Sequence, residues 1–255
     1  MLYTLLSLPL LGSPALHPPP ARPPVRLEDA EERYEALTDE MDAIVAAWRK
    51  QVTEARQAPQ DGESVPAIPM SPDFSSLIPK FQQAAADFAG TDDAVQFLTW
   101  LLTSRNTEAA TAAIATLTES HAGSSAISEM GGMFGYLAMM TNEEAAAAFL
   151  AAVKAENKDQ DVLGWVALTE HKDTIDKAPR DSDEYRVAKE TLLAHAEKVK
   201  DARLKSQITG AIELREKYGV GCVAPDIVGT DLGGVDFKLS DYEGKIIFLD
   251  FWGDW

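Results

Sequence analysis

The sequence predicts a mostly α protein: an all-α helical array over residues 27–219, followed by short β-strands over residues 220–255. Through most of the first region, apolar residues recur every three or four positions, as on amphipathic helices. After Val220, glycine and proline become frequent and short apolar runs replace that period. The chain has 255 residues, 45% of them hydrophobic, which is enough to build a sizeable core.

Residues 1–26 are predicted to be a signal peptide and a spacer. The apolar run Leu2–Leu11 is too short to span a bilayer, which needs about 20 apolar residues. The small residues of Ser13-Pro14-Ala15 suit a signal-peptidase site, although no basic residue precedes Arg22. His17–Pro24 is typical of a stiff polyproline spacer. We therefore expect a periplasmic or otherwise extracytoplasmic protein. The alternative is a cytoplasmic protein whose first residues are a disordered leader or follow a misplaced start codon.

A single long helix is predicted from Leu27 to Gln57. Its apolar residues form one stripe at alternating steps of mostly three and four: Leu27, Ala30, Tyr34, Leu37, Met41, Ile44, Trp48, Val52 and Ala55. Acidic residues crowd its first turns, where the helix dipole favours them. We expect this stripe to pack on the rest of the domain; the alternative is a helix-mediated dimer through Leu27–Ala55.

A Pro- and Gly-rich linker, Ala58–Pro72, separates this helix from a series of shorter ones. Helices are predicted at Phe74–Phe88, Asp92–Ser104, Thr107–Ser120, Ser125–Met140, Glu143–Glu156, Val162–His171, Ser182–Lys198 and Ala202–Tyr218. Thr107 is the predicted N-cap of the helix Thr107–Ser120, and Thr141 or Asn142 that of Glu143–Glu156. Gly219 is the predicted C-cap of Ala202–Tyr218. The short joints favour an array of helical hairpins without a fixed repeat.

Strand signals begin after this array. Ile227–Gly229 and Val235–Leu239 flank a Thr-Asp-Leu-Gly-Gly segment, which predicts a β-hairpin. Ser240–Gly244 reads as a turn. Ile246–Phe251 is almost wholly apolar, as expected of a central strand covered on both faces.

Charge and cysteine content exclude several function classes. The formal net charge of −18 argues against nucleic acid or anionic lipid as a partner. The single cysteine, Cys222, excludes an intramolecular disulfide and a zinc site with several thiolates, and we expect it to be a partly buried small residue. The four histidines are scattered, so no metal site and no cofactor are expected.

Three motifs near the end of the chain carry a family resemblance: Ala224-Pro-Asp226, Leu239-Ser-Asp-Tyr-Glu-Gly-Lys245 and Asp250-Phe-Trp-Gly-Asp-Trp255. In this order and spacing they resemble the start of the TlpA/ResA-like branch of the thioredoxin superfamily, which is often grouped with alkyl hydroperoxide reductase/thiol-specific antioxidant proteins. The resemblance covers Val220–Trp255 only. It implies the first strands of an incomplete α/β thioredoxin-like fold, and the helical array lies outside it.

The resemblance also implies a site. In this family, the segment leads into a redox Cys-Gly-Pro-Cys whose first cysteine is the nucleophile, and here that position would follow Trp255. Asp250 maps onto the buried carboxylate that accepts protons behind the dithiol; the alternative is a strand-end residue without a role. Trp252 and Trp255 would flank the active site or simply pack. Protein thiols and disulfides would be the substrates, and the chain as given would be inactive.

Two hypotheses follow for the function. The first is a thioredoxin-like thiol–disulfide oxidoreductase without its dithiol; the second is a non-enzymatic, all-α interaction or scaffold protein with a remnant tail. Three explanations compete for an end at Trp255: a nonsense mutation or clipped fragment, a sequence error, and a UGA codon for selenocysteine. We favour the UGA codon, because it predicts an end directly before the nucleophile. We expect 220–255 to be loosely attached and cut by proteases near Gly219–Val223.

Overall fold

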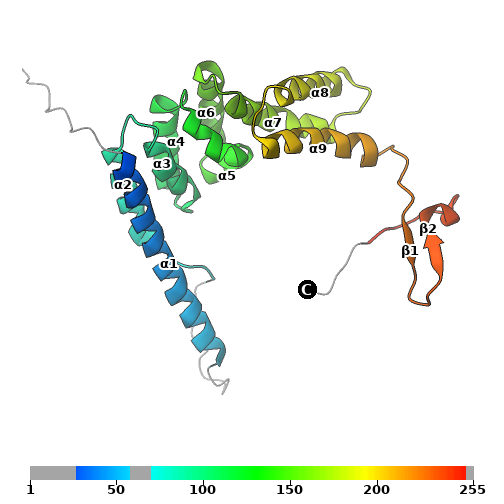
Figure 1. Ribbon diagram of the computed structural model, residues 1–255, viewed down its shortest axis with the longest axis horizontal. Helices are drawn as coiled ribbons and strands as arrows, with labels where there is room; N and C mark the ends of the chain where they lie inside the picture. Colours follow the sequence, from blue (N-terminus) through cyan, green and yellow to red (C-terminus); the bar gives the residue numbers. More distant parts are fainter. Residues whose placement is uncertain (1–26, 58–69, 251–255) are drawn as a thin grey trace, which may run out of the picture.

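The structure is a computed structural model that describes residues 27–57 and 70–250. It is mostly α, as the sequence predicted, and its described part contains one two-stranded sheet. Figure 1 shows the helices as an extended array with the β-hairpin beyond its last helix. The helices and strands are α1 (Leu27–Gln57), α2 (Ile78–Asp87), α3 (Ala94–Thr103), α4 (Thr107–Ser120), α5 (Leu137–Met140), α6 (Glu143–Glu156), α7 (Gln160–Lys177), α8 (Asp183–Ala196), α9 (Ala202–Tyr218), β1 (Val228–Thr230) and β2 (Asp236–Lys238), with 3₁₀ helices η1 (Ser75–Leu77), η2 (Ser125–Tyr136) and η3 (Leu239–Tyr242).

Helix α1 packs on the array through its first half. Ala30 and Leu37 are buried, and Met41 receives a hydrogen bond of 2.9 Å at its sulfur from the Trp100 indole N–H. In Figure 1 the second half of α1 runs on past the array. The expectation that the apolar stripe packs on the rest of the protein is therefore confirmed for its first half. The dimer through Leu27–Ala55 stays a prediction.

Aromatic side chains join α1, α2 and α3. Phe81 stacks on Trp100 with ring centroids 3.7 Å apart, and Tyr34 meets Phe81 and Phe97 edge-on. Phe81 and Phe97 are fully buried. Such rings remove large apolar areas from water and restrict their mutual geometry, so this cluster fixes α1 against the start of the array.

The prediction of one helix over Ser125–Met140 is wrong. The segment forms the 3₁₀ helix η2 over Ser125–Tyr136 and only then the short helix α5. The 3₁₀ segment approaches α7 closely: a Cβ atom on Gly131 would lie 2.1 Å from Cδ1 of Trp165. Gly131 lets this backbone lie directly on the indole ring, which no residue with a side chain allows.

Two polar side chains tie neighbouring helix ends together. Asn157, buried after α6, donates from its side-chain amide to the carbonyls of Ala122 and Ser124, both at 2.8 Å. Asp161, at the start of α7, accepts the backbone N–H groups of Lys200 and Asp201 at 2.7 and 3.0 Å. Buried polar groups in proteins are almost always hydrogen-bonded in this way. These bonds set the joints between successive hairpins of the array.

Most helix ends follow the sequence signals. The helix Thr107–Ser120 has its predicted bounds, but its N-cap is Asn106, whose side chain accepts the Ala109 N–H at 2.9 Å. Asn142, one of the two predicted alternatives, caps α6 in the same manner. Helix α7 is longer than predicted. Gly219 ends α9, as expected.

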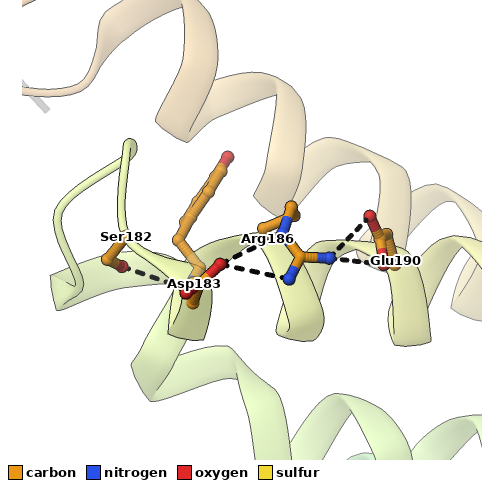
Figure 2. A network of polar contacts seen from close by, with 5 residues as sticks. Ser182, Asp183, Arg186 and Glu190 are labelled. Carbon is orange, nitrogen blue, oxygen red and sulfur yellow. Dashed lines mark hydrogen bonds and ion pairs between the residues drawn. The ribbon is translucent and has the colours of Figure 1, made fainter.

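Helix α8 carries a polar network that Figure 2 shows from close by. The Ser182 hydroxyl caps the helix by accepting the Tyr185 N–H at 3.2 Å. Arg186 then bridges Asp183 at 3.1 Å and Glu190 at 3.3 Å along the same face. Hydrogen bonds from Arg186 to Asp183 and then to Glu190 raise the pKa of the guanidinium. All three side chains are exposed, so these pairs add little stability and are typical of a solvated helix face.

Candidate functional site

The first family motif, Ala224–Asp226, directly precedes the β-hairpin and the second, Leu239–Lys245, directly follows it. A carboxylate shapes the turn of the hairpin. Val228 pairs with Lys238 and Thr230 with Asp236, in antiparallel register. The Asp231 side chain accepts the N–H groups of Gly233 and Val235 at 2.8 and 2.9 Å. Gly234 takes a φ of +80°, which favours glycine. The predicted hairpin is thus confirmed.

A second carboxylate joins two of the motifs. Asp226, from the Ala-Pro-Asp motif, accepts the Ser240 backbone N–H at 2.7 Å and the Ser240 hydroxyl at 2.9 Å. Ser240 belongs to the Leu-Ser-Asp-Tyr motif, fourteen residues later. The Leu239 N–H donates to the Ile227 carbonyl at 2.9 Å beside it. The bond from the Ser240 amide, and then that from its hydroxyl, hold the pKa of Asp226 below its usual value.

The rest of the second motif forms a compact turn. Asp241 accepts the Lys238 N–H at 3.0 Å, and the Lys245 ammonium lies over the Tyr242 ring, 5.6 Å from its centroid. Gly244 has a φ of +81°, so a side chain at this position would be strained. Gly244, Asp226 and Asp241 of these motifs therefore each stabilise the local structure.

The predicted central strand over Ile246–Phe251 is not formed by its described residues, 246–250. Ile246 and Phe248 are almost fully exposed, at 103% and 90%. A strand needs a neighbour to bond its N–H and C=O groups, and no described strand pairs with this segment. Asp250, expected to be buried, has an exposed side chain. Its role at a dithiol stays a prediction, and Trp252 and Trp255 lie outside the described residues.

Cys222 lies where the array passes into this region. Its sulfur receives a hydrogen bond of 3.0 Å from Arg180, in the α7–α8 joint, and donates one of 2.9 Å to the Glu216 carbonyl in α9. The thiol is half-buried, as predicted. Arg215 donates to the Ala178 carbonyl at 2.8 Å beside it. Sequence reasoning missed Arg180, because nothing local points to a partner forty-two residues away.

The described residues offer little else of catalytic character. No three of their His, Cys, Asp or Glu side chains are grouped so that they could hold a metal ion. None of the described helices is both long and apolar enough to cross a membrane. The polar network of α8 consists of ion pairs on an exposed helix face and the Ser182 N-cap, so it has a structural explanation.

Comparison with known proteins points to the C-terminal part. The chain is 61% identical over 36 residues to the thiol–disulfide oxidoreductase ResA of Geobacillus kaustophilus, which is 14% of this chain and 21% of that protein. It is 46% identical over 46 residues to ResA of Bacillus cereus, which is 18% of this chain and 27% of that protein. The similarity is to thiol–disulfide oxidoreductases. The chain spans about a quarter of the length of these two relatives. No protein-family model and no solved structure matches it.

Proposed function

We propose that residues 220–255 are the beginning of a thioredoxin-like thiol–disulfide oxidoreductase domain, preceded by an all-α domain over residues 27–219. One observation carries this proposal: Asp226 and Ser240 bind each other and so join two motifs that the family has in the same order. The short but strong similarity to ResA proteins supports it independently. The dithiol would be supplied by residues that follow Trp255 in a longer protein.

The chemistry would be thiol–disulfide exchange with protein substrates. A thiolate at the start of a helix attacks a substrate disulfide, which releases one substrate thiolate and leaves a mixed disulfide; the second thiol of the pair then resolves it. The substrate leaves as a dithiol, and the enzyme is oxidised to a disulfide. In this proposal, Asp250 takes and returns protons behind the dithiol, and Trp252 and Trp255 border it. Asp250 would then have to become buried once its strand is paired.

The nucleophile itself is open to a direct test. We propose that the nucleophile is the residue after Trp255 in a longer protein, a cysteine or a selenocysteine, because the family resemblance puts the first residue of the redox pair there. Sequencing the coding DNA past codon 255 decides: a cysteine codon or an in-frame UGA, followed by codons for a thioredoxin-like remainder, is expected. DNA that encodes neither residue near this position would refute the proposal.

The activity can be measured on the extended protein. We expect reduction of insulin disulfides by dithiothreitol to be accelerated by the protein, and Asp250→Asn to slow it at least tenfold at neutral pH. Glu243→Gln is a matched control, because Glu243 is exposed and lies in the η3 turn outside the proposed site. Equal rates with and without the protein would favour the second candidate, a non-enzymatic helical scaffold. That candidate has one observation in its favour: in the part of the chain that the structure describes, the buried core lies between Ala30 and Ile212.

Two further proposals concern the N-terminal half. We propose export, on the basis of the apolar run and the small residues at Ser13–Ala15. N-terminal sequencing of the mature protein should then begin near residue 16, and a mature chain that begins at Met1 would contradict export. Dimerisation through α1 is testable by sedimentation, where a monomer at micromolar concentration would exclude it.

A further inference from the structure

A groove lies between η2, α7 and α9. It has a volume of about 370 Å³, within the size range of ligand pockets in proteins, and its lining includes Gly131, Gly132, Gly135, Tyr136, Trp165 and Gln207. We call it the Trp165 groove. Gly132 and Gly135 are exposed, and a Cβ atom on Gly135 would meet nothing within 4 Å. These glycines let a ligand approach the η2 backbone closely.

The indole N–H of Trp165 points to a ligand in this groove. The residue is only 6% exposed, and no hydrogen-bond partner of its N–H is found within residues 27–57 and 70–250. The indole N–H of Trp100, in contrast, donates to the Met41 sulfur at 2.9 Å. Among the described residues, the fully enclosed polar atoms without a partner are His195 Nδ1 and Arg215 Nε, so the Trp165 N–H still reaches the groove that its side chain lines. A buried donor of this kind is costly to leave unpaired, and an acceptor on a ligand would pair it.

The charged side chains at the edge of the groove pair with one another. Lys172 forms an ion pair with Asp176 at 2.6 Å, and Asp173 forms one with Lys177 at 2.5 Å. These pairs leave little net charge for an ionic ligand. The Gln207 amide, which also lines the groove, has no hydrogen-bond partner in the described part of the chain. The groove therefore suits a neutral ligand with hydrogen-bonding groups.

An extended peptide has this chemistry. One of its carbonyls can accept the Trp165 N–H, and an apolar side chain can pack against Tyr136, which is 59% exposed. A sugar would instead stack on an open aromatic face, but the Trp165 ring lies against the Gly131 backbone. We propose that the Trp165 groove binds an apolar, extended segment of a protein substrate. The proposal rests on the proposed function only in taking proteins as the substrates.

The experiment measures binding of a peptide that cannot exchange disulfides. Fluorescein-labelled insulin B chain with carboxymethylated cysteines is the probe, because it is unfolded and rich in apolar residues. Fluorescence anisotropy with the 255-residue chain should show saturable binding. This binding needs no dithiol, so it supports the groove proposal whether or not the extended protein reduces insulin, and the two proposals can fail separately.

Filling the groove should abolish this binding. Gly135→Leu places a side chain in the open space, and we expect it to weaken binding at least tenfold. Gly210→Leu in α9 is the matched control, because a Cβ atom there also meets nothing within 4 Å and Gly210 is not among the lining residues. The control should bind like the unchanged chain, and circular dichroism should show both variants folded.

A second variant tests the indole N–H and keeps the test open if Gly135→Leu fails to fold. Trp165→Phe keeps an aromatic ring but removes the donor, and should weaken binding about fivefold. Trp100→Phe is its control, because that N–H bonds Met41 outside the groove. No saturable binding, unchanged affinity in folded Gly135→Leu or Trp165→Phe, or an equal loss in the controls would each overturn the proposal. Binding of cellopentaose but not of the B chain would assign the groove to sugars and overturn it as well.

Discussion

The helical array and the C-terminal region both follow their sequence signals locally, yet only the array encloses a core. Among the described residues, 27–57 and 70–250, the buried apolar side chains lie between Ala30 and Ile212. Residues 223–250 form a hairpin with well-made hydrogen bonds, but leave Leu232, Ile246 and Phe248 at least 90% exposed. Hydrogen bonds thus give the C-terminal region its shape, whereas apolar burial, the main driving force of folding, is confined to the helices.

The difference shows which interactions each kind of structure needs. A hairpin needs only its turn and a few local side-chain bonds, such as those of Asp226 and Asp231. A central strand needs partners on both sides, and two strands alone are marginal in water. An exposed apolar strand segment such as Ile246–Leu249 is also an aggregation hazard. Changes in the array should therefore alter global stability, and changes in the C-terminal region should not.

The largest effect is expected where η2 touches α7. Gly131→Ala would place a methyl group inside the Trp165 ring, and we expect it to lower the free energy of unfolding by about 3 kcal/mol or more. Gly135→Ala is the control in the same 3₁₀ helix, because a Cβ there meets nothing within 4 Å. Urea unfolding followed by circular dichroism measures both. Equal stability of the two variants would mean that η2 does not lie on Trp165.

A smaller loss is expected at the buried joint after α6. Asn157→Ala removes two side-chain bonds and leaves the Ala122 and Ser124 carbonyls without these donors, which should cost about 2 kcal/mol. Lys158→Ala, at the next and exposed position, should change the free energy of unfolding little. The same urea experiment applies. A loss below about 0.5 kcal/mol for Asn157→Ala would show that water satisfies these groups equally well.

The array should also be less stable in mild acid. Burial lowers the pKa of both His121 and His195, and the positive charges of Lys198, His171 and Lys154 lower that of His195 further, against Glu170. The folded state therefore binds protons less readily than the unfolded state, whose histidines titrate near pH 6.5. Stability should be complete above that pH and fall as the pH drops below it.

Urea midpoints measured between about pH 7.5 and pH 5 test this dependence. His195→Gln should flatten the pH profile, because it removes one of the two groups. His171→Gln is the comparison: it leaves His121 and His195 in place and removes only one of the charges that lower the pKa of His195, so it should change the profile less than His195→Gln. A profile that is unchanged by His195→Gln would contradict the assignment.

The smallest effect on global stability is expected in the C-terminal region. Asp226→Ala should leave the unfolding midpoint of the helices unchanged, because its carboxylate bonds Ser240 and, among the described residues, none of the helices. The Ser240 amide should nevertheless exchange its hydrogen faster, as seen by mass spectrometry of the corresponding peptide. Asp236→Ala is the control within the hairpin, since Asp236 accepts the Thr230 hydroxyl and does not bond Ser240. A drop in the helical midpoint with Asp226→Ala would show that the two regions fold together.

The sequence predicted the helices well because their information is local. Asn142 and Gly219 cap helix ends as predicted, and the bounds of α1, α4, α6 and α9 were predicted correctly, although the N-cap of α4 is Asn106 and not Thr107. The predictions that failed depend on contacts between residues that are far apart in the sequence. A helical period over Ser125–Met140 does not reveal that Trp165 presses on Gly131, and an apolar run such as Ile246–Phe251 does not reveal whether strands flank it. The bond between Asp226 and Ser240 joins two quoted motifs, but neither motif alone indicates it.

Hydrogen–deuterium exchange across the whole chain tests the central contrast most directly. At neutral pH, amides of α3, α4, α6 and α7 should be protected up to global unfolding, whereas those of residues 246–250 should exchange at nearly the rate of an unstructured peptide. The hairpin amides of Phe237 and Leu239 should fall between these limits. Protection of residues 246–250 equal to that of α7 would show that the C-terminal region shares the helical core and would contradict this account.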